Sequence, residues 1–122
     1  MDSQNVLLGK IELAYTGLTE CRNLAYQAAI ELQSTKDELE SKEIHVIALG
    51  YPDGTQKNAD TRSAYVDSQT IAEREAVKSA KSEYDAGELA LNHARDLVNH
   101  MRLMVDVMAI PASAAQTSGA YA

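Results

Sequence analysis

The chain has 122 residues, with 11 lysines and arginines against 18 aspartates and glutamates, and a single cysteine. This length accommodates one domain, and one cysteine excludes an internal disulfide. The net charge of −7 argues against binding nucleic acid through charge alone. No apolar run is long enough to span a bilayer, and the polar start shows no secretory signal. We therefore expect a cytoplasmic protein that does not bind membranes.

Apolar residues in the first half recur at alternating intervals of four and three residues, which is typical of the contact seam of a coiled coil. The twelve seam positions, ten of them apolar, are Leu7, Ile11, Ala14, Leu18, Cys21, Ala25, Ala28, Leu32, Thr35, Leu39, Lys42 and Val46. This seam predicts one helix from about residue 3 to about residue 49. Two alternatives stay open: a kink at Gly17 that gives a compact bundle of three or four helices, and a short β-hairpin within residues 44–56.

Turn-forming residues follow the first helix. Gly50, Pro52, Asp53 and Gly54 indicate a turn over about residues 50–57, and Asn58 is suited to cap a second helix. We predict that this helix runs from about residue 58 to about residue 108. Its seam is expected at Ala90, Ala94, Leu97, Met101, Met104 and Met108, preceded by Ile71, Ala72, Ala76 and Ala80. Pro111 then disfavours helix, so the domain is expected to end near residue 110, and residues 111–122 to form a disordered tail.

Two long helices joined by a short turn predict an all-α fold, an antiparallel coiled-coil hairpin. Counting around the turn places Ala28 opposite Ala80, and Leu8 and Ile11 opposite Met101–Met104. Further apolar residues lie outside the seams, and a lone hairpin would expose them: Leu13, Leu24, Ile30, Ile44, Val98, Leu103, Val105 and Val107. Exposed apolar surface of this kind marks interaction sites. We therefore expect either a dimer that forms a four-helix bundle or a hairpin docked on a protein partner.

Few residues suggest chemistry. His93, Asp96 and His100 share one helical stripe and are the candidate metal ligands, but no Glu-x-x-His pattern accompanies them. An exposed polar face is the simpler interpretation. Cys21 lies on the first seam without an evident base, as expected of an apolar filler. No triad, acid–base pair or phosphate-binding loop is present, so we expect neither an enzyme nor a cofactor.

Basic residues gather near the turn and interleave with glutamates. They are Lys57, Arg62, Arg74, Lys78 and Lys81. Mixed charge of this kind is typical of a solvated helix surface. The alternative is contact with single-stranded nucleic acid through Lys57, Arg74, Lys78 and Lys81, with Tyr51 and Tyr65 stacking on bases. Packing of the two tyrosines under the turn is the simpler interpretation.

The segment after the turn resembles a pattern found in small helical proteins of bacteriophages and prophages. In those proteins a turn is followed by Gly-Lys-Asn-Ala, two variable residues and Arg, between two long helices. Here Lys57, Asn58, Ala59 and Arg62 match, and Gln56 replaces the glycine. The resemblance implies a phage or mobile-element setting with no assigned activity.

Asn58 and Arg62 are the candidate structural residues of the tip. We expect Asn58 to cap the second helix, and Arg62 to bind the last carbonyls of the first helix, which are unsatisfied. The sequence as a whole predicts a non-enzymatic interaction or assembly protein. An accessory factor for single-stranded nucleic acid is the alternative.

Overall fold

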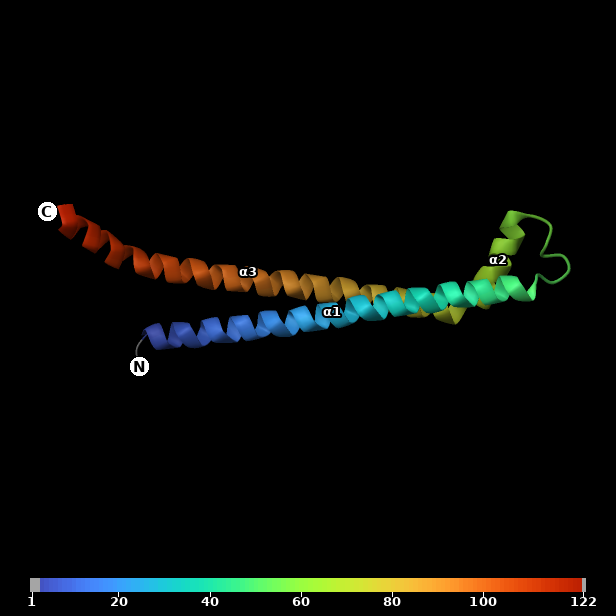
Figure 1. The fold of residues 1–122 in the computed structure, drawn as a ribbon, viewed down its shortest axis with the longest axis horizontal. Coiled ribbons are helices and arrows are strands. Elements are labelled where there is room, and N and C mark those ends of the chain that lie inside the picture. The colour runs from blue at the N-terminus through green and yellow to red at the C-terminus, as the bar shows by residue number, and fades with distance from the viewer. Residues whose placement is uncertain (1–2, 122) are drawn as a thin grey trace. The chain divides into compact units, whose positions relative to one another are not determined.

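The computed structural model describes the backbone of residues 3–121 and the side chains of residues 4–108 (Figure 1). Its elements are the helices α1 (Ser3–Leu49), α2 (Ala59–Gln69) and α3 (Ile71–Tyr121). The chain forms two compact units, the terminal unit (Met1–Leu24 with Glu88–Ala122) and the loop unit (Ala25–Gly87). In each unit α1 packs against α3, which confirms the prediction of an all-α fold with two long packed helices.

The seam predicted for α1 is confirmed at every position, because each of its residues is buried or half-buried. Ala14, Leu18 and Ala25 are among the most buried apolar residues of the described chain. The helix continues through Gly17, so a break there is wrong. It also continues through residues 44–49, and no residue from 3 to 121 forms a strand, which excludes the β-hairpin alternative.

α1 ends at the predicted turn. Gly50 has φ +88° and Gly54 has φ +89°, a backbone region that residues with a side chain rarely adopt. The Gly50 N–H donates to the Ile47 carbonyl at 3.1 Å, which satisfies one of the last carbonyls of α1. The Thr55 N–H donates to the Pro52 carbonyl at 3.1 Å and closes the tight turn that follows.

The second helix is not continuous as predicted, because Thr70 separates α2 from α3. Thr70 is fully buried at 0% exposure. Its hydroxyl donates to the Val66 carbonyl at 2.9 Å, and its own carbonyl accepts from the Arg74 N–H at 3.0 Å. One residue therefore closes α2 and opens α3. A threonine can do this because its hydroxyl competes for backbone carbonyls, and no proline or glycine marks the break in the sequence.

The core face of α3 differs from the predicted seam. Leu91 and Val98 are buried, Val98 at 3% exposure, whereas Leu97 is 46% exposed. Two patterns with the same spacing overlap in this part of the sequence, and both contain Ala94, Met101 and Met108. Steps of four and three from Gly87 lead to Leu91, Ala94 and Val98, which is the pattern that the structure uses.

Gly87, in the loop unit, lies on the α1-facing side of α3. A Cβ atom built on Gly87 would lie 3.6 Å from Ala25 Cα and 4.0 Å from Ala28 Cβ. The backbones of α1 and α3 therefore approach closely at this point. The predicted register is wrong as well, since Gly87 lies against Ala25 and Ala28, where counting around the turn places residues about one helical turn earlier in α3.

The displaced register follows from the direction of α2. Within the loop unit α2 crosses α1 at a steep angle, and only α3 runs beside α1 (Figure 1). Counting residues around the turn assumes that the chain runs straight back along α1 after the turn. Residues 59–70 do not run along α1, so the count gives the wrong partners.

The end of α3 also differs from the prediction of a helix that stops near Met108 before a disordered tail. α3 continues through Pro111 to Tyr121. Proline removes one backbone donor from a helix, but four alanines within residues 109–115 favour helix.

Candidate functional site

Asn58 and Arg62 organise the tip of the loop unit. The Asn58 side-chain oxygen accepts from the Thr61 N–H at 2.8 Å, which confirms the predicted cap of α2. Arg62 Nη1 donates to the Gln56 carbonyl at 3.1 Å, and Gln56 Nε2 donates to the Tyr51 carbonyl at 2.7 Å. The prediction that Arg62 binds the last carbonyls of α1 is wrong, because its partner lies in the loop. Arg62 therefore joins the first turn of α2 to the connecting segment.

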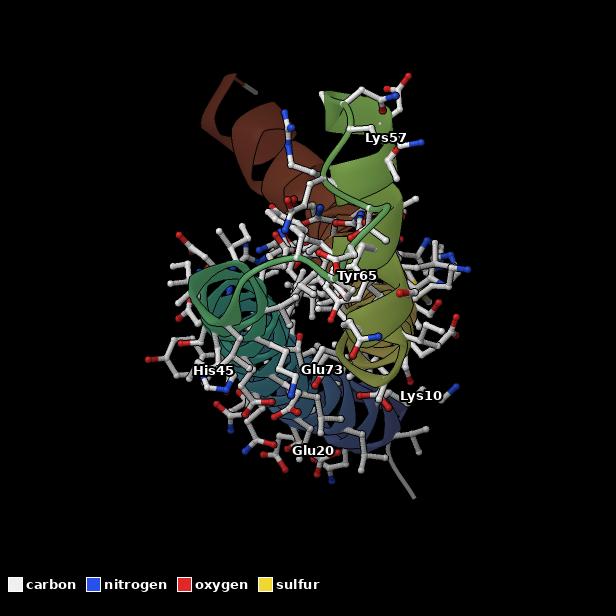
Figure 2. All side chains as sticks on the ribbon, turned by 90° about the vertical axis from the view of Figure 1, so that its right-hand side faces the viewer. Lys10, Glu20, His45, Lys57, Tyr65 and Glu73 are labelled. Atoms are coloured by element: carbon white, nitrogen blue, oxygen red, sulfur yellow. The ribbon has the colours of Figure 1, made fainter. Side chains whose placement is uncertain are left out.

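The two tyrosines of the tip pack against each other. The ring centroids of Tyr51 and Tyr65 lie 5.9 Å apart with an interplanar angle of 65°, an edge-to-face contact. Both are half-buried. Figure 2 places Tyr65 between α1 and α2, whereas Lys57 points outward from the start of α2. The ring contact confirms that the tyrosines pack under the turn.

Carboxylates neutralise two of the four candidate nucleic-acid contacts. Arg74 forms an ion pair with Asp67 across the Thr70 break. Lys81 Nζ lies 2.6 Å from Asp85 Oδ1 and 5.5 Å from the ring centroid of Tyr84. The hydrogen bond that Lys81 donates to Asp85 is the largest of the effects that raise the pKa of Lys81.

Lys57 and Lys78, the other two candidates, are exposed. Only two of the four candidate side chains therefore lack a carboxylate partner among the described ion pairs.

The candidate metal ligands do not assemble a site. His93, Asp96 and His100 are exposed on α3, and the described residues include no three His, Cys, Asp or Glu side chains placed to hold a metal ion. Cys21 is a half-buried free thiol on the α1 seam. Its position matches that of a small apolar residue in the helix contact.

Large apolar side chains are exposed on the terminal unit. Of the eight apolar residues predicted to lie outside the seams, seven are exposed, in either unit, and Val98 is in the core. We define the apolar face by residues that their helical spacing places away from the Tyr15–Arg102 contact described below. It consists of Leu13, Leu24, Leu97, Met104 and Val107. Leu13 is 73% exposed and Leu24 is 62% exposed. This amount of uncovered side chain is unusual for a protein without a partner.

A groove between α1 and α3 of the terminal unit carries three arginines that the sequence analysis missed. It is lined by Tyr15, Leu18, Arg22, Arg95, Val98 and Arg102, together with Asn99. Arg102 Nε donates to the Tyr15 hydroxyl at 2.9 Å, and its guanidinium carbon lies 5.8 Å from the Tyr15 ring centroid. The seven-residue spacing of Arg95 and Arg102 was the available signal, because it places both on one face of a helix.

Comparison with known proteins identifies no relative, since no family model, curated protein or solved structure matches this chain. Within the described residues, no helix combines the length and the apolar character that crossing a bilayer requires.

Proposed function

We propose that this protein is a non-enzymatic interaction and assembly protein whose partner is a second copy of itself. The observation that supports this proposal is the apolar face of the terminal unit. Leu13 and Leu24 are more than half exposed. Transfer of their side chains from water into an interface would therefore be favourable. Burying one large apolar side chain contributes about 1.5–3 kcal/mol, so a face of several such residues can offset the entropy cost of association, about 4–15 kcal/mol.

The predicted dimer and four-helix bundle belong to the same proposal. In such a bundle, the apolar faces of two helix pairs would form the common core, as helix bundles commonly do. The phage or mobile-element setting is also part of the proposal. Its support is the match of Lys57, Asn58, Ala59 and Arg62 to the pattern described above.

The experiment is a measurement of molar mass by light scattering over a range of protein concentrations. We expect the wild-type protein to exceed the mass of one chain, 13.2 kDa. The double substitution Leu13→Glu/Leu97→Glu should lower the mass at each concentration, because it places charge on the apolar face.

The matched control is Asn23→Glu/Asn92→Glu, which adds the same charge at exposed positions of the same two helices outside the apolar face. It should leave the mass unchanged. A wild-type protein that stays monomeric at all concentrations, with full helical circular dichroism, would contradict the proposal.

A further inference from the structure

The groove of the terminal unit continues beyond its arginines. Leu8, Ile11 and Val105 line a mainly apolar part, which also contains Asp106. It shares Tyr15, Val98 and Arg102 with the basic part. Leu8, Ile11 and Val105 lead on to a hollow lined by Leu7 and Met108. Along α1 the groove is therefore apolar near residue 8 and basic near residue 22.

The basic part carries an excess of positive charge. Arg22, Arg95 and Arg102 line it, and none of its lining residues is acidic. Within the described part of the chain, the ion pairs are those of Arg74 and Lys81, and none of the three groove arginines takes part. Like charges in one groove repel each other, and Tyr15 holds Arg102 in place. This arrangement suits an incoming set of carboxylates, since a guanidinium group binds a carboxylate in a fixed geometry.

The end of α1 has the complementary pattern. Residues 37–43 contain Asp37, Glu38, Glu40 and Glu43, and the exposed apolar residues Ile44, Ile47 and Leu49 follow them. Along the helix this segment is first acidic and then apolar, the order that an antiparallel helix needs to match the groove.

The spacing of the two patterns agrees. Glu40 and Ile47 are seven residues apart on one helical face, which corresponds to about 10.5 Å along the axis. Arg22 and Tyr15 have the same separation on α1 and line the groove. An antiparallel helix with Glu40 at Arg22 therefore brings Ile47 to Tyr15, at the start of the apolar part.

We propose that the groove of the terminal unit binds residues 37–49 of α1 from a second copy of the chain. This inference rests on the proposed self-association and adds a second surface to it, because the groove lies on the side of the helix pair away from the apolar face. Each copy carries one groove and one segment, so two copies can exchange equivalent contacts, as expected for a symmetric dimer. A nucleic acid fits less well, since the net charge of −7 opposes its phosphates and the basic part occupies only one end of the groove.

The test exchanges the charges of the two surfaces. Arg95→Glu/Arg102→Glu makes the groove acidic, and Glu40→Arg/Glu43→Arg makes the segment basic. Each variant alone faces like charges at both contacts of a dimer, so we expect its dissociation constant to rise about tenfold or more relative to wild type. Analytical ultracentrifugation measures this constant, and circular dichroism verifies that each variant is helical.

A mixture of the two variants is the decisive measurement. A mixed dimer has one contact with exchanged charges and one wild-type contact, so we expect association within about threefold of wild type. The controls change the same number of charges elsewhere on exposed positions: Lys57→Glu/Lys78→Glu and Glu75→Arg/Glu83→Arg. Both should associate as the wild-type protein does.

The outcomes separate the two proposals. If both charge variants associate as tightly as wild type, or if the mixture fails to regain association, the groove does not bind this segment. The proposed self-association would then still stand. A wild-type protein that is monomeric throughout overturns both.

Discussion

At the scale of single residues, Arg62 holds the connection between α1 and α2 through the loop. It donates to the Gln56 carbonyl, and Gln56 in turn donates to the Tyr51 carbonyl. The two hydrogen bonds thus connect the first turn of α2 to Gln56 and, through the Gln56 side chain, to Tyr51. Arg62 is not needed at the end of α1, because the Gly50 N–H already donates to the Ile47 carbonyl there.

Replacing Arg62 with alanine should lower the free energy of unfolding by about 0.5–1.5 kcal/mol, the net contribution of one hydrogen bond. Urea denaturation followed by circular dichroism measures this change. Lys57→Ala is the control, because Lys57 is exposed and adjacent to the same loop. Equal stability of the two variants would show that the loop does not depend on Arg62.

At the scale of helices, Thr70 separates α2 from α3 with a hydrogen bond in a fully buried position. Thr70→Ala should lower the free energy of unfolding by about 1–3 kcal/mol, because it removes the part-buried hydrogen bond of a fully buried residue. The same urea titration measures it.

The control for this prediction is Ser68→Ala. The Ser68 hydroxyl donates to the Tyr65 carbonyl at 2.6 Å, but it does so on the exposed side of α2. Its loss should cost much less than the loss of the Thr70 hydroxyl. A Thr70→Ala protein as stable as Ser68→Ala would mean that packing alone, without the hydroxyl, separates the two helices.

The helices show how far the sequence alone leads. The α1 seam could be predicted at every position because one apolar pattern runs through it without competition. The α3 seam could not, because Leu97 and Val98 each extend a pattern of the same spacing. Their burial in the folded chain decides between them, with Val98 in the core and Leu97 exposed, and such burial depends on tertiary contacts.

The candidate sites divide in the same way. The Asn58 cap depends on neighbours in sequence and was predictable. The basic groove was not, because Arg22 lies far from Arg95 and Arg102 in the chain and reaches them only through the packing of α1 on α3. Short-range sequence patterns thus predicted the helix cap, whereas the residues of the groove are brought together by the packing of α3 on α1.

At the scale of the whole molecule, ionic strength should distinguish the two kinds of surface. Raising the salt from about 0.1 M to about 1 M shortens the screening length from about 10 Å to about 3 Å. We expect this change to weaken wild-type association about fivefold or more, because contacts between exposed charges are screened. Arg95→Gln/Arg102→Gln should respond less to salt, as measured by ultracentrifugation. Equal salt dependence of the two proteins would argue against the arginines as contacts.

Thr70 has a consequence for how this chain tolerates change. With α2 turned aside, the number of residues between Leu49 and Ile71 no longer dictates which partner each residue of α3 meets on α1. An insertion or deletion in the loop can then be absorbed by α2 without sliding α3 along α1. The short helix α2 therefore makes the pairing of α1 with α3 independent of the length of the loop that connects them.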